Sequence, residues 1–130
     1  MARELRSILF VEDEPDIQEV AKLALEAVGG FEVTVCSTGA EALAAAPNVK
    51  PDLILLDVMM PGMDGPGTMH ALRKLQVTAN TPVIFMTAKV RQAEIAQYKQ
   101  LGALDAIVKP FDPMTLSQRI SEIYQAAGDG

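Results

Sequence analysis

Large apolar residues gather in five short runs, separated by polar stretches that contain glycine and proline. We predict strands at residues 8–11, 31–35, 53–57, 82–86 and 105–108. Residues 53–56 are four consecutive aliphatic residues without polar alternation, which is typical of a central strand buried on both faces. Residues 31–35 alternate apolar and polar positions instead, as a half-exposed edge strand does.

A helical pattern follows each predicted strand. The expected helices cover residues 15–28, 39–46, 65–75, 91–101 and 113–127. Apolar residues at helical spacing predict the inner stripe of the first helix at Ile17, Val20, Ala21, Leu25 and Val28. Thr38 and Glu41 have the spacing of a capping box, and the alanine-rich helix after them is expected to stop before Pro47.

Five strands alternating with five helices predict an α/β fold. Right-handed crossovers then give a parallel five-stranded sheet covered by helices on both faces. The edge-like second strand and the apolar third strand favour the order 2-1-3-4-5, a doubly wound, flavodoxin-like (βα)5 arrangement. The length of 130 residues suits one domain, and no repeat or linker interrupts it.

Composition and charge narrow the function. The chain is 49% hydrophobic and 22% charged, as globular proteins are. Its formal net charge of −6 disfavours nonspecific binding to nucleic acid or to an anionic membrane. The single cysteine, Cys36, excludes an internal disulfide and suits a reducing cytoplasm. No apolar run is long enough for a signal-peptide core or a membrane span, so we expect a cytoplasmic protein.

Polar side chains follow four of the predicted strands. They are Glu12 and Asp13 after the first strand, Asp57 at the end of the third, Thr87 after the fourth and Lys109 after the fifth. An aspartate that closes a strand often only caps a turn, so Asp57 alone is ambiguous. The carboxyl ends of parallel strands meet at one edge of a sheet, however, so we expect all five side chains to converge there.

Three neighbouring carboxylates cannot all stay ionised without a counter-charge. Oxygen ligands without His or Cys favour Mg²⁺ or Mn²⁺ over zinc. The one histidine, His70, falls on the third helix, away from this edge, and is expected at the surface. A carboxylate nucleophile beside a metal ion, the Lys109 ammonium and the Thr87 hydroxyl can stabilise a phosphoryl group in transfer.

The sequence resembles the receiver domains of two-component response regulators, in particular those of the chemotaxis-regulator kind. The matching motifs are Glu12-Asp13, the segment from Asp57 through Pro61 and Gly62 to Asp64-Gly65, Thr87-Ala88 and Lys109-Pro110-Phe111. The resemblance covers the whole chain. It implies a single receiver domain over residues 1–130, with a core of about residues 6–127 and no effector domain.

The resemblance also implies a metal site. Mg²⁺ would be bound by the carboxylates of Asp13 and Asp57, by the backbone carbonyl of Met59 and, through water, by Glu12. Many family members have Asp at the position of Glu12. One extra methylene keeps the charge, so we expect metal binding to survive this difference.

The implied chemistry is phosphorylation of Asp57 by a phosphohistidine on a sensor histidine kinase or a histidine phosphotransfer protein. Lys109 and Thr87 would contact the phosphoryl oxygens, Ala88 would leave room for them, and Pro110 would follow a cis peptide. Such a domain is a phosphoacceptor and not an enzyme, since it catalyses only its own phosphorylation and slow dephosphorylation.

Two further positions bear on switching. Ala106 stands where the family commonly has Tyr or Phe, whose ring moves inward on activation. Activation here uses another element such as loop 87–91, or the output depends less on a switch, or Ala106 only packs in its strand. Met59 and Lys89 are expected to flank Asp57, and because the Met59 side chain cannot orient water, we expect a phosphoaspartate that is not especially short-lived.

A candidate partner face lies on the fourth helix. Arg91, Ile95, Tyr98 and Lys99 fall on one side of it. Solitary exposed apolar residues are common without a partner, so this assignment has an ordinary alternative. Output would go to a downstream protein by contact or by onward phosphotransfer. The initiating Met1 and short tail favour a free-standing regulator over a receiver taken from a hybrid kinase.

Two other functional classes fit less well. A haloacid-dehalogenase-like phosphohydrolase needs a second acid two residues after its nucleophile, where this chain has Met59. A flavodoxin-like FMN carrier needs a hydroxyl-rich loop after the first strand. The acidic stretch Glu12-Asp13-Glu14 would repel the FMN phosphate instead.

Overall fold

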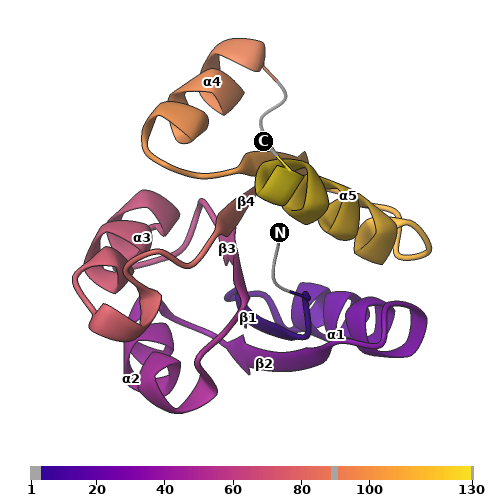
Figure 1. Ribbon diagram of the computed structural model, residues 1–130, viewed down its shortest axis with the longest axis horizontal. Coiled ribbons are helices and arrows are strands. Elements are labelled where there is room, and N and C mark those ends of the chain that lie inside the picture. The colour runs from indigo at the N-terminus through magenta and orange to yellow at the C-terminus, as the bar shows by residue number, and fades with distance from the viewer. Residues whose placement is uncertain (1–3, 89–90, 130) are drawn as a thin grey trace.

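The computed structural model, which describes residues 4–88 and 91–129, is a parallel five-stranded sheet with helices on both faces (Figure 1). The elements are β1 Ser7–Val11, α1 Pro15–Leu23, η1 Ala24–Val28, β2 Glu32–Cys36, α2 Gly39–Val49, β3 Leu53–Asp57, α3 Gly65–Arg73, η2 Gln76–Thr78, β4 Val83–Thr87, α4 Gln92–Gln100, β5 Asp105–Val108 and α5 Leu116–Asp129. The strand order is β2-β1-β3-β4-β5, and all neighbours are parallel. The predicted doubly wound (βα)5 fold is confirmed.

Two hydrophobic layers sandwich the sheet. Helices α2, α3 and α4 cover one face and α1 and α5 the other (Figure 1). Strand β3 serves both layers, because Ile54 and Leu56 belong to the first and Leu53 and Leu55 to the second. Every residue of β3 is buried, as its unbroken apolar run predicts. The edge strand β2 is half-exposed, as its alternation predicts.

The predicted inner stripe of the first helix is only partly right. Ala21 and Leu25 are fully buried, but Val20 and Val28 are 44% and 51% exposed. Ala24 is buried beside them, and it begins η1, a turn of π-helix in which the Gly29 N–H bonds to the Ala24 carbonyl five residues back. This wider turn changes the angular spacing of the residues after it, so a stripe drawn at 3.6 residues per turn fails there.

Helix α2 does not stop before Pro47, as predicted, but continues to Val49. Pro47 is exposed, and the helix ends one turn later at Lys50, which has a left-handed backbone with φ of 49°. The missing N–H of a proline removes one helical hydrogen bond without forcing an end here. The predicted cap at the other terminus is confirmed, because the Thr38 hydroxyl accepts from the Glu41 N–H at 3.0 Å.

Helix α5 begins later than predicted. The Asp112 carbonyl accepts from the N–H groups of Thr115 and Leu116, so a turn precedes the helix. The side chain of Met114 in this turn is 71% exposed. Within residues 4–88 and 91–129, no helix has both the length and the apolar character that a membrane span requires.

Candidate functional site

The sheet brings the polar strand ends to one edge. Asp57 closes β3 and pairs in register with Met86 on β4, one residue before Thr87. The N–H of Lys109, which follows β5, donates to the Thr87 carbonyl at 2.8 Å. On the other side of β3, the N–H of Glu12 donates to the carbonyl at the end of β2. Backbone hydrogen bonding therefore fixes the places from which these side chains project.

Three carboxylates meet at this edge. Oxygen atoms of Glu12, Asp13 and Asp57 all lie within 4.8 Å of one another. Glu12 is fully buried and Asp57 is 2% exposed, whereas Asp13 is partly open to solvent. The Oδ1 atom of Asp57 is buried and accepts no aligned hydrogen bond from the described residues. A half-open set of hard oxygen atoms with a free acceptor fits a Mg²⁺-sized cation.

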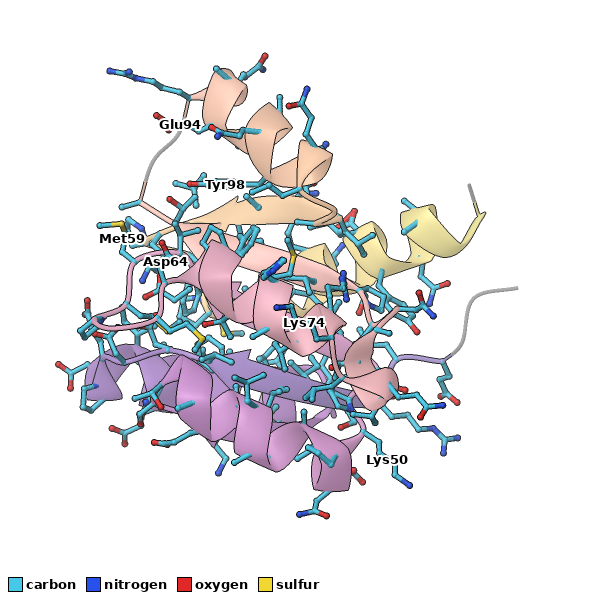
Figure 2. All side chains as sticks on the ribbon, turned by 90° about the vertical axis from the view of Figure 1, so that its left-hand side faces the viewer. Lys50, Met59, Asp64, Lys74, Glu94 and Tyr98 are labelled. Carbon is cyan, nitrogen blue, oxygen red and sulfur yellow. The ribbon has the colours of Figure 1, made fainter. Side chains whose placement is uncertain are left out.

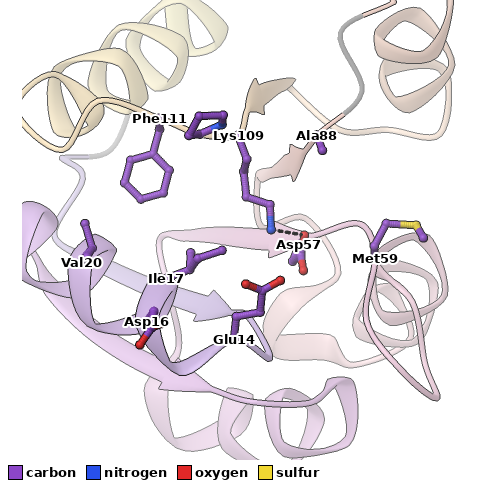
Figure 3. Close-up of a pocket in the computed structure, with 10 residues that line it drawn as sticks. Glu14, Asp16, Ile17, Val20, Asp57, Met59, Ala88, Lys109 and Phe111 are labelled. Carbon is purple, nitrogen blue, oxygen red and sulfur yellow. Dashed lines mark ion pairs between the residues drawn. The ribbon is translucent and has the colours of Figure 1, made fainter.

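Lys109 forms ion pairs with two of these acids. Its Nζ lies 3.0 Å from Glu12 Oε1 and 3.0 Å from Asp57 Oδ1 (Figure 3 draws the second pair). The contact to Asp57 is an ion pair, and among the described residues Oδ1 has no other polar partner. Burial alone would lower the pKa of Lys109, but the two carboxylates outweigh it and raise that pKa. The ammonium is therefore a fixed positive charge.

Glu12 is held in an unusual state. Burial is the largest cause that raises the pKa of its carboxyl to about 7, and the negative charge of Asp57 adds to it. A hydrogen bond from the Glu14 N–H at 3.2 Å and the Lys109 ammonium oppose the shift. Both oxygens of Glu12 thus have protein partners, and its protonation is sensitive near neutral pH.

Asp57 opens into a pocket of about 580 Å³ (Figure 3). Its walls are Glu14, Asp16, Ile17, Val20, Asp57, Met59, Ala88, Lys109, Pro110 and Phe111. Five of them, Glu14, Asp16, Ile17, Val20 and Phe111, were not among the predicted site residues. Ile17 and Val20 were predicted to face the core instead. Both lie in the first turns of the helix that begins directly after the acidic pair, and this proximity was the available signal.

The remaining predicted site residues lie as follows. Thr87 ends β4 and is 2% exposed, whereas Ala88 is exposed at the pocket. The Met59 side chain is 70% exposed at the rim. Pro110 follows a cis peptide bond, as predicted. Lys89, the other expected neighbour of Asp57, lies outside the described residues.

The structure contradicts the expected exposure of the apolar residues in the candidate partner face on α4. Tyr98 is only 8% exposed, and its ring lies 5.1 Å from that of Phe85, tilted by 57°. Figure 2 shows Tyr98 between α4 and the sheet. Ile95 packs against the same hydrophobic layer, so only Arg91 and Lys99 of the predicted face are exposed.

The apolar pair was assigned to the wrong side of α4. Ile95 and Tyr98 are three residues apart and share the inner side, whereas Leu101 on the outer side is 52% exposed. Ala106 on β5 is opposite Phe85 and 5% exposed within this layer. The aromatic contacts near position 106 therefore come from β4 and α4.

Known proteins match this chain over almost its full length. A family model described as "Response regulator receiver domain" matches residues 8–121. The phosphate regulon transcriptional regulatory protein PhoB of Pseudomonas aeruginosa is 37% identical over 125 residues, which cover 96% of this chain and 54% of PhoB. The DNA-binding response regulator MtrA of Mycolicibacterium smegmatis is 35% identical over 87% of this chain and 48% of its own length.

A solved structure of a chemotaxis protein has the same fold as this chain. The Vibrio cholerae chemotaxis protein CheY4 superposes with a TM-score of 0.84 at 31% identity, covering 92% of this chain and 99% of CheY4. The chain spans about half the length of PhoB and MtrA. The match of sequence, fold and strand-end acids shows that this chain belongs to the response regulator receiver domain family.

Proposed function

We propose that the chain accepts a phosphoryl group on Asp57 from a phosphohistidine of a sensor histidine kinase or a histidine phosphotransfer protein. The observation that carries this proposal is the contact of Lys109 Nζ with both Asp57 and Glu12, at the floor of an open pocket. A carboxylate that is 2% exposed yet faces a pocket can react with a group delivered from outside. Receiver domains are signalling modules and not a catalytic family.

In this reaction the phosphoryl group passes from an imidazole nitrogen of the donor to a carboxylate oxygen of Asp57. A carboxylate oxygen of Asp57 bonds to phosphorus as the phosphorus–nitrogen bond to the donor imidazole breaks. The electron pair leaves with the imidazole, which takes up a proton from water. Lys109 and the Thr87 hydroxyl stabilise the negative charge on the phosphoryl oxygens, and Ala88 leaves them room at the pocket.

The proposed cofactor is Mg²⁺, and Mn²⁺ suits the same ligands. Asp13 and Asp57 would hold it by their carboxylates, Met59 by its backbone carbonyl and Glu12 through water. The three acidic oxygens within 4.8 Å of one another support this assignment, as does Asp57 Oδ1, whose one polar neighbour among the described residues is the Lys109 ammonium. When bound, the cation supplies positive charge to the phosphoryl oxygens.

We propose that the output passes to a protein, by contact or by onward phosphotransfer, in the cytoplasm. The net charge of −6 argues against nucleic acid as a direct partner of this chain. PhoB and MtrA are named as a transcriptional regulator and a DNA-binding regulator, but each is about twice as long as the matched segment.

The test is incubation with Mg²⁺ and acetyl phosphate, followed by intact mass measurement. We expect one phosphoryl adduct on the wild type and none on Asp57→Asn. The matched control is Asp105→Asn, which removes a carboxylate from the opposite end of β5 and should still gain the adduct. An adduct that persists in Asp57→Asn, or its absence from the wild type, would refute the proposal.

A further inference from the structure

Gly65 lies against the backbone that carries the phosphoacceptor. It is the first residue of α3 and is buried. A Cβ atom at this position would lie 2.5 Å from the Asp57 carbonyl oxygen and 2.8 Å from the Val58 Cα. Side chains do not approach backbone atoms this closely, so the chain tolerates no side chain at Gly65 without a local shift.

Backbone hydrogen bonds restrict any such shift at the start of α3. The Gly65 N–H donates to the Val58 carbonyl at 2.9 Å, and the Val58 N–H donates to the Met86 carbonyl at 3.0 Å. The start of α3 is therefore bonded to the end of β3, which is bonded to β4. Any displacement at Gly65 passes directly to the peptide that joins Asp57 to Val58.

Helix α3 is also confined on its far side. A Cβ at Gly39, the first residue of α2, would overlap with the Thr68 Oγ1 of α3. The two helices thus approach without a gap at this point. If Gly65 carried a side chain, α2 would oppose the movement of α3 away from β3. The Asp57–Val58 peptide would then have to move instead.

We propose that Gly65 is a positioning residue for the phosphorylation site, an inference that depends on the proposed function. Its missing side chain sets where the Asp57–Val58 peptide lies, and with it the Asp57 carboxylate and the Met59 carbonyl that follows. Asp64 and Met59 lie at the same end of the molecule (Figure 2), since the loop from β3 folds back to the start of α3. Gly65 acts through Asp57 and touches neither phosphate nor metal.

Backbone conformation does not explain the glycine. Positive φ angles occur at Gly30, Gly62 and Gly102 among the described glycines, but not at Gly65. Alanine could adopt the Gly65 backbone, and it favours helix over glycine. What excludes it is contact with Asp57, so the effect of a substitution should appear at the site.

The test compares Gly65→Ala with Gly67→Ala. Both changes add one methyl group to the first turn of α3, but a Cβ at Gly67 has as its nearest atom the end of the Asp64 side chain, at 3.0 Å. Amide chemical shifts give the Mg²⁺ dissociation constant and report folding in the same titration. We expect Gly65→Ala to raise this constant by about 10-fold, as changes behind a metal ligand do, and Gly67→Ala to stay within about twofold of the wild type.

Phosphorylation supplies a second readout. With acetyl phosphate at subsaturating Mg²⁺, Gly65→Ala should gain the phosphoryl group more slowly than Gly67→Ala, and saturating Mg²⁺ should narrow the difference. Equal constants for the two variants would overturn the inference, and so would a Gly65→Ala chain that has lost its dispersed spectrum. A wild type that binds Mg²⁺ but gains no phosphoryl group would instead refute the proposed function.

Discussion

Lys109 Nζ lies 3.0 Å from Glu12 Oε1, although 97 positions separate the two residues in the chain. Sequence reasoning assigned Lys109 to the phosphoryl group and Glu12 to the metal ion, and it did not pair them. The ammonium is thus a counter-charge of the two buried acids, Glu12 and Asp57. The same lysine would serve the phosphoryl group only after its bonds are rearranged.

The first prediction concerns Lys109→Met. Removing the ammonium leaves Glu12 and Asp57 buried without their positive partner. We expect the free energy of unfolding of the metal-free protein to fall by about 3 kcal/mol, as for other broken buried pairs. Urea unfolding followed by circular dichroism measures this. Mg²⁺ should restore more stability to the variant than to the wild type, because it replaces the lost charge.

The matched control is Lys99→Met. The Lys99 side chain is 53% exposed and lies 4.0 Å from Asp105, so its loss should change stability by less than about 1 kcal/mol. Equal losses in the two variants would show that Lys109 is not the counter-charge of the site. A Lys109 variant that Mg²⁺ does not stabilise would contradict the replacement argument.

The second prediction is a pH dependence of stability. Burial raises the pKa of Glu12 to about 7 in the folded protein, from an ordinary value of 4.5. The folded state then binds the proton more tightly than the unfolded state, so the stabilisation is complete below pH 4.5 and is lost as the pH rises through 7. We expect the metal-free protein to lose about 2 kcal/mol between pH 5 and pH 8 through this group.

Glu12→Gln isolates the effect. Glutamine cannot titrate, so the difference in unfolding free energy between wild type and variant should change with pH in the stated direction. Titrating groups away from the site are common to both chains and cancel, and Lys109, whose pKa is raised, stays charged between pH 5 and pH 8. A difference that stays constant from pH 5 to pH 8, measured in a chelating buffer, would refute the assigned pKa.

The fold was predictable from sequence because its signals are local and repeated. The buried run that ends at Asp57 identified the central strand, and the alternation after Phe31 identified the edge strand. With the strand order in hand, geometry alone brings Glu12, Asp57 and Lys109 to one edge. The convergence of the site was therefore implied by topology, before any side-chain contact was known.

The errors share a different cause. Val28 was misplaced by a π-helical turn, and Tyr98 by the choice between two sides of a weakly amphipathic helix. The last helix was predicted to begin at residue 113, but a turn at Asp112 precedes it and leaves Met114 exposed. Each outcome depends on tertiary packing or on nonstandard backbone, which the pattern of apolar positions does not encode.

The third prediction tests the corrected side of α4. Tyr98→Ala removes a buried ring that packs on Phe85, so we expect a loss of about 3 kcal/mol in unfolding free energy. Tyr98→Phe keeps the ring contact and should lose much less. Leu101→Ala, at a position that is 52% exposed, is the control and should be nearly neutral. If Leu101→Ala proved more damaging than Tyr98→Ala, the helix would face the other way.

The fourth prediction concerns the lifetime of the phosphoaspartate. Hydrolysis needs a water molecule aligned with the phosphorus atom, and the Met59 side chain at the pocket rim has no group to orient one. Met59→Asn supplies an amide that can hold this water. One net hydrogen bond of about 1 kcal/mol corresponds to dephosphorylation about fivefold faster. After removal of acetyl phosphate, the decay of the adduct in the mass spectrum gives the rate.

The matched control is Met63→Asn, which alters the same loop at a position that does not line the pocket. Its phosphoryl adduct should decay at the rate of the wild type. The two variants add the same amide at different positions. If both variants lost the phosphoryl group faster than the wild type, or if neither did, the side chain at position 59 would not control the lifetime of the phosphoaspartate.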